Sequence, residues 1–411
     1  MKDKTIDVSR GIVSYCTGNL TVIDNLLKIY KKIGKVLLVE ATANQVNQFG
    51  GYTGMTPKKF AEKIHNLARK NNFPENLLIL GGDHLGPLTW KNKEADQAMS
   101  LAKDLVHDFV EAGFQKIHLD TSMKLADDDK NGPLSLGIIA QRGCDLFIEC
   151  ETTAAKYGYQ CIYTIGSEVP IPGGEVRSQI SVTCPNDVKA TITEYSNAFK
   201  KNIVANKNFS KVKAIVVQPG VEFSLDTKIN FDPEKAKSLC ELLQSELTQF
   251  VYEGHSTDYQ TKASLKAMVK NGVKILKVGP ALTYAYRCAL IRLECLEHDI
   301  KGISYSNFSS VLKQTMIAEP KYWESYYSQQ MDIDHSGSYL DRERYYLSDS
   351  KVERCINILK QNIDTYAKES LLYKWFPNEF ESYSMSDGSF FDFVIQKSIE
   401  NEVCKYESAI D

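Results

Sequence analysis

Short apolar segments alternate with longer amphipathic segments over residues 8–300 of this 411-residue chain. The apolar segments have the length and composition of buried parallel strands. They cover residues 11–15, 35–41, 77–82, 116–120, 160–165, 212–217, 250–252 and 273–278. Eight strand–helix units in a row predict a (β/α)8 TIM barrel. A doubly wound open sheet is the main alternative, although that fold usually has fewer strands.

The segments between the expected strands carry the signals of amphipathic helices. Apolar residues recur at helical spacing over residues 20–33, and Thr56-Pro57 supplies an N-cap and a first-turn proline for the next helix. Beyond about residue 301 the strand signal stops, and helices are expected over 311–318, 351–368 and 391–404. The sequence therefore predicts an α/β chain with a barrel over residues 8–300 and a helical C-terminal extension over residues 301–411, packed on the barrel.

Composition and charge narrow the class of protein. The formal net charge is -3 and the pI about 6.2, so the chain offers no basic surface for nucleic acid or anionic lipid. No apolar run approaches the roughly 18 residues of a membrane helix, and residues 1–7 contain no apolar signal core. The ten cysteines include no CxxC pair, which favours reduced, buried thiols over a disulfide scaffold. We therefore expect a cytoplasmic protein that binds neither nucleic acid nor membrane.

Polar side chains gather where the expected strands end, and in a barrel the carboxyl ends of the strands carry the functional residues. These positions hold Glu40, Gln45 and Asn47 after the second strand, Asp83 and His84 after the third, Asp120 at the end of the fourth, Glu168 and Glu175 after the fifth, Gln218 after the sixth, His255 and Asp258 after the seventh, and Lys277 and Gly279 at the end of the eighth. A barrel mouth with this many carboxylates and carboxamides and two histidines favours a bound cation.

His84 and His255, with a carboxylate such as Glu168, suit Zn²⁺ or Mn²⁺ with an open coordination position. Such a metal would polarise a substrate carbonyl while Asp83 moves a proton. The competing interpretation is that each histidine is a hydrogen-bonded structural residue. His118 lies inside the fourth expected strand, and we interpret it as a packed histidine. Glu175 follows two glycines and is alternatively a turn residue.

Two further places are candidate anion sites. Backbone N–H groups around Gly279, at the start of the eighth helix, are one. Arg342, Arg344 and Tyr345 form the other, with a surface pairing of Asp341 and an arginine as the competing interpretation.

Several segments in order resemble one family. They are Glu40–Pro57, Gly81–Pro87, Lys116–Asp120, Gly166–Glu175, Val217–Phe223, His255–Gln260, Lys277–Thr283 and Asp341–Tyr346. They resemble the Z-type (GatZ/KbaZ) subunit family of class II D-tagatose-1,6-bisphosphate aldolase. The match runs through nearly the whole barrel.

The resemblance implies a class II aldolase-like barrel for tagatose-type ketohexose phosphates in galactitol or amino-galactose breakdown. It also implies that Asp83 is a proton donor, that His84 and His255 are metal ligands, and that Glu168 and Glu175 belong to the site. Gln218 stands where the aldolases have a third histidine ligand, so Glu168 is expected to complete the metal site. Thr17–Leu20 departs from the family's usual turn after the first strand.

Three functions are compatible with this resemblance. The first is a tagatose-1,6-bisphosphate aldolase subunit with its own metal-dependent retro-aldol site, in which Asp83 and Glu175 are the acid and base. The second is a stand-alone 4-epimerase that interconverts fructose- and tagatose-type sugars. The third is a non-catalytic partner that stabilises a Y-type aldolase subunit. In the first two, Gln45, Asn47, Gln218 and Asp258 would orient hydroxyl groups. We also expect a homo-oligomer.

Overall fold

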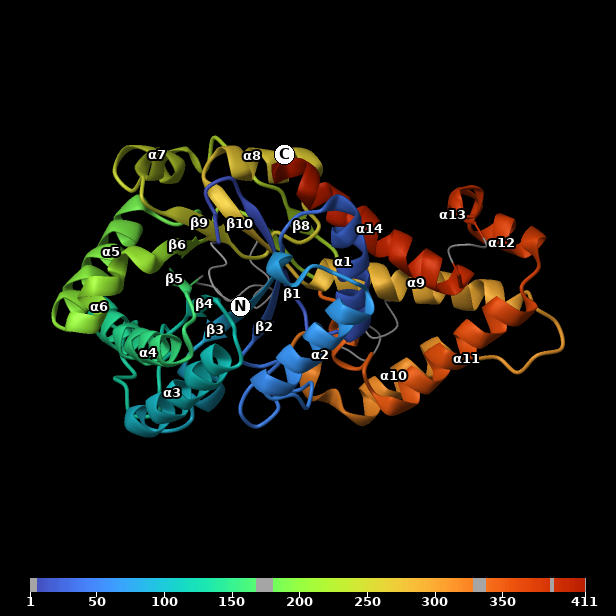
Figure 1. The fold of residues 1–411 in the computed structure, drawn as a ribbon, viewed down its shortest axis with the longest axis horizontal. Helices are drawn as coiled ribbons and strands as arrows, with labels where there is room; N and C mark the ends of the chain where they lie inside the picture. Colours follow the sequence, from blue (N-terminus) through green and yellow to red (C-terminus); the bar gives the residue numbers. More distant parts are fainter. Residues whose placement is uncertain (1–5, 168–179, 328–337, 385–387, 411) are drawn as a thin grey trace. The chain divides into compact units, whose positions relative to one another are not determined.

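Eight parallel strands pair into a closed barrel in the computed structural model, which describes residues 6–167, 180–327, 338–384 and 388–410 (Figure 1). The strands are β1 (Ile12–Cys16), β2 (Leu37–Thr42), β3 (Leu78–Leu85), β4 (Lys116–Leu119), β5 (Ile162–Ile165), β6 (Val212–Val217), β9 (Val251–Gly254) and β10 (Val273–Val278). β1 closes the ring because it pairs in parallel with both β2 and β10. The (β/α)8 prediction is confirmed, and the open-sheet alternative is wrong.

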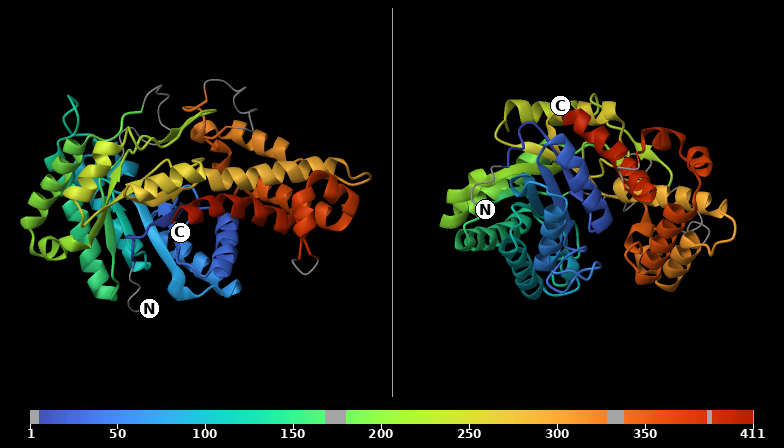
Figure 2. Two further views of the ribbon diagram at one scale, coloured as in Figure 1. Left: turned by 90° about the horizontal axis from the view of Figure 1, so that it is seen from above. Right: turned by 45° about the vertical axis from the view of Figure 1, so that its right-hand side comes forward.

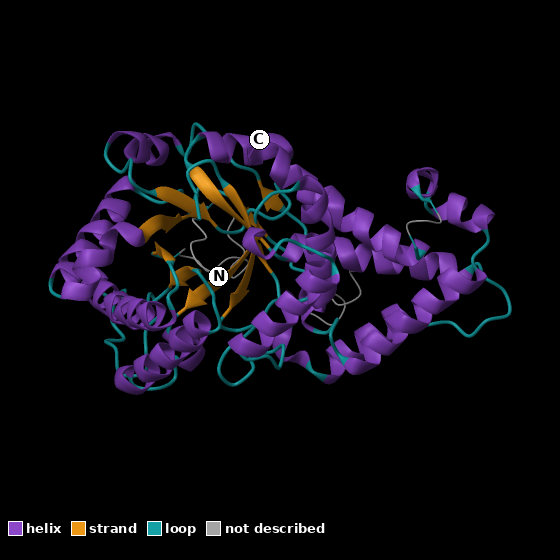
Figure 3. Cartoon of the chain, in the orientation of Figure 1, coloured by secondary structure: helices purple, strands orange, loops and turns teal. Residues whose placement is uncertain are grey.

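Helices enclose this ring of strands, as Figure 3 shows by colour. They are α1 (Leu20–Ile33), α2 (Pro57–Lys70), α3 (Ala95–Glu111), α4 (Leu136–Tyr157), α5 (Pro185–Lys200), α6 (Ile203–Asn208), α7 (Lys237–Ser245) and α8 (Lys262–Lys270). The expected cap of α2 is present, since the Thr56 hydroxyl accepts a hydrogen bond from the backbone N–H of Lys59. Asn19 caps α1 in the same way. A small hairpin of β7 (Glu222–Phe223) and β8 (Lys228–Ile229) lies between β6 and α7 in the chain.

The chain divides into two compact units, of which the first holds the barrel strands, residues 1–223 and 228–278, together with residues 406–411. The second comprises residues 224–227 and 279–405. Its helices are α9 (Pro280–His298), α10 (Phe308–Ala318), α11 (Ser350–Tyr366), α12 (Glu369–Trp375), α13 (Pro377–Ser382) and most of α14 (Phe390–Ile410). The expected C-terminal helices are therefore present. Within the described residues, no helix is long and apolar enough to cross a membrane.

Buried carboxylates tie the helices of the second unit together. Glu297 of α9 is fully buried and accepts hydrogen bonds from Ser306 and from Asn362 of α11. Glu294 accepts from the backbone N–H of Ser309 at the start of α10. α9 and α14 run side by side in Figures 1 and 2, and the Ser398 hydroxyl donates to the carbonyl of Ala285 at 2.9 Å.

The barrel interior changes from apolar to charged along its axis. At the amino end of the strands an apolar cluster fills the barrel, formed by Ile6, Val8, Ile12, Leu38, Ile79, Ala214 and Ile275. Closer to the carboxyl ends of the strands, the inward positions are Glu40, Lys116 and Glu253, and all three are fully buried. Barrel interiors are usually filled by branched apolar side chains. This layer therefore places buried carboxylates and an ammonium group directly next to the polar mouth of the barrel.

The last residues of α14 belong to the barrel unit. The Tyr406 hydroxyl donates to the carbonyl of Thr257, in the loop after β9, at 2.7 Å. Tyr30 of α1 hydrogen-bonds to Tyr15 of β1 at 2.9 Å and to the carboxylate of Glu407. Lys35 adds an ion pair with Glu407. Residues from both ends of the chain thus share one buried polar contact.

Candidate active site

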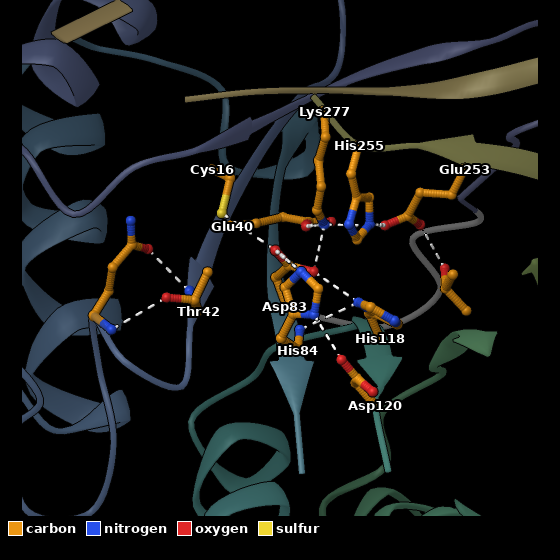
Figure 4. A network of polar contacts seen from close by, with 12 residues as sticks. Cys16, Glu40, Thr42, Asp83, His84, His118, Asp120, Glu253, His255 and Lys277 are labelled. Atoms are coloured by element: carbon orange, nitrogen blue, oxygen red, sulfur yellow. Dashed lines mark hydrogen bonds and ion pairs between the residues drawn. The ribbon is translucent and has the colours of Figure 1, made fainter. Parts of the chain in front are cut away.

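A bulge in β3 directs two consecutive side chains into the barrel mouth. Alternation along a strand sends neighbouring side chains to opposite faces. The register between β3 and β4 shifts between Gly82 and Leu85, and His84 has a left-handed backbone with φ of 46°. A non-glycine residue in this conformation costs roughly 1–3 kcal/mol and occurs preferentially at functional sites. Because of the bulge, Asp83 and His84 lie in the same cluster (Figure 4).

His118 of β4 is buried, as expected, but it points into this cluster. Its Nδ1 lies 2.8 Å from Asp83 Oδ1, and its Nε2 lies 2.8 Å from the carbonyl oxygen of Gly166. The interpretation of His118 as a packed histidine alone omitted it from the site. The signal was the strand alternation, because Lys116, His118 and Asp120 fall on one face of β4.

Three imidazole rings meet in the barrel mouth. The ring centroids of His84 and His255 are 4.8 Å apart, and His118 lies 4.8 Å from His84 and 5.3 Å from His255. His84 Nδ1 lies 2.9 Å from Asp120 Oδ2 and donates a proton to this carboxylate, so Nε2 is the ring nitrogen that could bind a metal. His255 Nε2 lies 3.1 Å from Glu253 Oε1, which leaves the lone pair on Nδ1. Carboxylates fix metal-binding histidines in this manner.

Two buried lysines hold the carboxylates beneath the histidines. Lys116 Nζ lies 2.9 Å from Glu40 Oε1 and 2.7 Å from Glu253 Oε2. Lys277 Nζ lies 2.7 Å from Asp83 Oδ1 and 3.0 Å from Glu253 Oε1, and it also pairs with Glu40. Figure 4 shows Lys277 and His255 pointing together toward Asp83. The lysines make ionised carboxylates stable at a depth where isolated charges are very unfavourable.

The charges shift the pKa values of the cluster in opposite directions. Burial would raise the pKa of Asp83, but His84, Lys277 and His118 hold it well below its usual range, so Asp83 is a carboxylate. Burial lowers the pKa of His255 to about 3, and its imidazole is neutral at physiological pH. For His84, Asp83 and Asp120 outweigh burial and raise the pKa above the usual value. The ionised carboxylate of Asp83 thus lies in the same cluster as the neutral imidazole of His255.

The donor atoms fit a divalent cation. One ligand atom from each of Asp83, His84, His118 and His255 lies within 4.8 Å of the others. Imidazole nitrogen with carboxylate oxygen is a donor set for Zn²⁺ and related metals. A second group of carboxylates, Glu40, Asp83 and Glu253, is equally close. That group already surrounds the ammonium groups of Lys116 and Lys277, so the lysines occupy the place of a cation there.

Other residues predicted for the site have different placements. Gln45 and Asn47 are buried and hold their own loop, because Gln45 accepts from the N–H of Thr42 and Asn47 accepts from the N–H groups of Phe49 and Gly51. Gln218 accepts from the N–H groups of Gly220 and Val221. Asp258 is buried in the loop after β9.

The remaining predicted residues lie outside the barrel unit or outside the described residues. Gly279 immediately precedes α9, and Arg342 and Arg344 lie in the short 3-10 helix η6 (Arg342–Tyr345), all in the second unit. Glu168 and Glu175 are outside the described residues.

Parallel strands with alternating helices, and a histidine–carboxylate cluster at the carboxyl ends of those strands, define a (β/α)8-barrel protein with a polar site in its mouth. The chain belongs to the family described as D-tagatose-1,6-bisphosphate aldolase subunit GatZ/KbaZ-like, which matches residues 1–411. The resemblance in the sequence motifs is thereby confirmed.

Relatives share most of the chain. The D-tagatose-1,6-bisphosphate aldolase subunit GatZ of Klebsiella pneumoniae subsp. pneumoniae is 41% identical over 92% of this chain and 90% of its own length. The subunit of the same name from Salmonella dublin is 40% identical over 91% of this chain and 89% of its own. A solved structure from Sinorhizobium meliloti 1021, described as a probable tagatose 6 phosphate kinase, has a TM-score of 0.85 and 33% identity, covering 97% of this chain and 100% of that one.

Proposed function

We propose that this chain acts on ketohexose phosphates as a Z-type subunit of a tagatose-1,6-bisphosphate aldolase, with a metal-dependent site for retro-aldol and aldol chemistry in its barrel mouth. The observation that carries the proposal is the position of the ionised Asp83, which lies 2.8 Å from His118 and 2.7 Å from the ammonium group of Lys277. The cations keep this carboxylate ionised, so it is available beside the metal-type ligands to accept the proton of a substrate hydroxyl.

The charge of the cluster supports a divalent metal, Zn²⁺ or Mn²⁺. Among the described residues, the carboxylates of Glu40, Asp83, Asp120 and Glu253 face only two ammonium groups, those of Lys116 and Lys277. Because a bound metal would displace the protons of its imidazole ligands, two negative charges would then remain, which a divalent cation would balance. His84 Nε2 and His255 Nδ1 are the proposed ligands, with Glu168 as the further ligand that the sequence suggests and His118 as a neighbour of both.

The residues of the chain have distinct roles in the proposed reaction. Asp83 takes the proton of the C4 hydroxyl as the C3–C4 bond breaks and the electron pair of that bond passes to C3 and the adjacent C2 carbonyl, and it returns the proton when the bond forms again. Release of the ketone fragment by an aldolase also requires an acid that protonates C3. Lys277 keeps Asp83 ionised and favours negative charge nearby. A metal held by His84 and His255 would supply Lewis acidity toward the substrate carbonyl. Glu175 is the proposed second acid or base, and Glu40, Gln45, Asn47, Asp120, Gln218, Asp258 and Gly279 are proposed to position the substrate or its direct contacts.

The same steps support a 4-epimerase as a second candidate function. An aldolase releases the aldehyde fragment after cleavage, whereas an epimerase rotates it and adds it back. The purified chain, treated with chelator and resupplied with Zn²⁺ or Mn²⁺, is given fructose 6-phosphate or tagatose 1,6-bisphosphate. Triose phosphates indicate an aldolase, and tagatose 6-phosphate without triose phosphates indicates an epimerase. Chelation is expected to abolish either activity.

A non-catalytic role is the third candidate, because the relatives are named as subunits. In that case the isolated chain converts neither sugar, and adding a Y-type class II aldolase subunit restores activity.

Asp83→Asn discriminates between the candidates. We expect it to lower kcat by roughly 10²–10⁴-fold if the chain is catalytic, and to leave the rescue of a Y-type subunit intact if it is not. His107→Ala, a half-exposed histidine paired with Glu149, is the matched control and leaves activity unchanged.

A further inference from the structure

The segment Asp341–Tyr345 separates its acidic and basic side chains. The Asp341 carboxylate is fully buried and accepts hydrogen bonds from Arg287 Nε at 2.8 Å and from the Thr283 hydroxyl at 2.5 Å. Glu343 also faces Arg287, at 3.8 Å. The alternative expectation of a surface pairing of Asp341 with an arginine is therefore wrong, because its partner Arg287 is buried. Both acids of the segment face Arg287.

Arg342 is a buried cation without an acidic partner in the described part of the chain. Its relative exposure is 7%. The guanidinium carbon lies 3.2 Å from the ring centroid of Tyr326, and Nη1 donates to the Tyr345 hydroxyl at 3.3 Å. Nε of Arg342 is buried, and none of the residues that the structure describes accepts a hydrogen bond from it. Aromatic faces stabilise a guanidinium, but they do not replace the hydrogen bonds that a buried charge loses on leaving water.

A second guanidinium lies beside the first. Arg344 Nη2 donates to the same Tyr345 hydroxyl at 3.1 Å, and its guanidinium carbon lies 4.5 Å from the ring centroid of Tyr345. Nη1 of Arg344 donates to the backbone carbonyls of Leu340 and Asp341, which fix this guanidinium beside Arg342. Burial and then the charge of Arg344 lower the pKa of Arg342. Two like charges around one phenol, with one of them buried and incompletely hydrogen-bonded, form an arrangement that an anion would stabilise.

We propose that Arg342 and Arg344 form a binding site for a phosphoryl group. Planar guanidinium forks bind phosphate oxygens through paired, charge-assisted hydrogen bonds, and this chemistry uses the Nε–H and Nη–H groups of Arg342 together. The assignment of the phosphoryl group to a ketohexose phosphate rests on the proposed function. The site itself does not, since free inorganic phosphate has the same chemistry.

Binding is measured directly on the full chain, with and without Zn²⁺, by calorimetry and by the shift in Tm. The ligands are inorganic phosphate, fructose 6-phosphate and fructose, with sodium chloride at matched ionic strength. We expect both phosphorylated ligands to bind and raise Tm, and fructose and chloride to have no such effect in the metal-free chain. Tighter binding of fructose 6-phosphate than of phosphate identifies the sugar phosphate as the ligand, and equal binding identifies free phosphate.

Two variants and a control test the residue assignment. Arg342→Met is expected to weaken phosphate binding by at least about tenfold, and Arg342→Lys to restore part of it because the ammonium group keeps the charge without the fork. Lys374→Met removes an exposed charge of the same unit, paired with Asp299, and leaves binding unchanged. Without phosphate, Arg342→Met is expected to keep or raise Tm, because the change removes a buried charge that has no acidic partner among the described residues.

Two results would overturn the proposal. One is the absence of phosphate and fructose 6-phosphate binding to the wild-type chain. The other is equal binding by wild type and Arg342→Met. If the chain binds phosphate but converts no sugar, the proposed function fails while this site stands. If it converts sugars without binding phosphate, the site fails alone.

Discussion

Glu253 contacts four groups at once in the barrel interior. Its carboxylate pairs with Lys116 and Lys277, accepts from Thr164, and lies 3.1 Å from His255 Nε2. This residue therefore shares in neutralising two buried lysines, together with Glu40 and Asp83, and orients a proposed metal ligand. Any substitution of Glu253 is therefore expected to be destabilising, because the two lysines lose an ion pair and Thr164 and His255 each lose a hydrogen bond.

Replacing Glu253 by Gln tests this combination of roles. The change removes one of the two carboxylates around Lys116 and one of the three around Lys277, so we expect it to lower the free energy of unfolding by about 1.5–3 kcal/mol. Loss of the carboxylate behind His255 is expected to weaken Zn²⁺ binding by roughly 10–100-fold. Urea unfolding and metal titration measure the two effects. Glu246→Gln is the control, since Glu246 forms an exposed pair with Lys189, and a change above about 1 kcal/mol there would count against the argument.

Single residues of the site were predictable to the extent that they follow a strand. Asp83, His84 and His255 were identified because strand ends in a barrel share one edge. His118 and Lys116 lie inside β4 and were not identified, although strand alternation places them on the face of Asp120. Glu253 directly precedes the end of β9, but its pairing with Lys116 joins residues far apart in sequence, and no local pattern encodes it.

The end of β3 requires a glycine at position 86 in addition to its bulge. Gly86 follows β3 with an extended backbone, so the requirement there is space. A Cβ atom at Gly86 would lie 1.8 Å from the carbonyl oxygen of Asp120. Asp120 in turn holds His84 at 2.9 Å. The close approach of the two backbones therefore sets the orientation of a proposed metal ligand.

Gly86→Ala is expected to force β3 and the end of β4 apart. We expect a loss of about 3 kcal/mol in the free energy of unfolding, together with weaker Zn²⁺ binding because Asp120 moves away from His84. Gly137→Ala, in the first turn of α4, is the matched control. A Cβ atom there meets only Glu194 Oε2 at 3.6 Å, so this change is expected to be neutral or stabilising by up to about 1 kcal/mol. Equal effects of the two changes would refute the explanation.

The elements themselves were largely encoded in local sequence. The order of strands and helices follows from apolar periodicity, and α1 and β6 have the predicted bounds. The bulge in β3, the short α6 and the β7–β8 hairpin were not predicted. A bulge and a two-residue strand have no periodicity to detect, because they are set by contacts with other strands.

The barrel unit also contains residues that are distant from its strands in sequence. Tyr406 and Glu407 contact the Thr257 carbonyl and Tyr30, respectively. The helical character of the C-terminal part was predictable from its periodicity. The particular residues that join the barrel unit were not, because a hydrogen bond between Tyr30 and Glu407 leaves no trace in either local sequence.

Tyr30→Phe tests how much this contact contributes. The change removes a hydroxyl that serves both Tyr15 and Glu407, and we expect it to lower the free energy of unfolding by about 1–3 kcal/mol. Chemical denaturation of the full chain measures the loss. Tyr373→Phe, at a side chain that is 53% exposed, should change stability by less than about 0.5 kcal/mol. If both variants unfold at the same denaturant concentration, the contact has no energetic importance.

The contacts of Tyr406 and Glu407 have a consequence for synthesis on the ribosome. All eight strands emerge well before these two residues, because β10 ends at Val278. During the interval the loop after β9, which carries His255, lacks its Tyr406 hydrogen bond, and the Tyr15–Tyr30 pair lacks Glu407. A nascent barrel is therefore complete in its strand order before it is complete in its packing. The length of that interval is set by the synthesis of residues 279–405, which separate β10 from Tyr406.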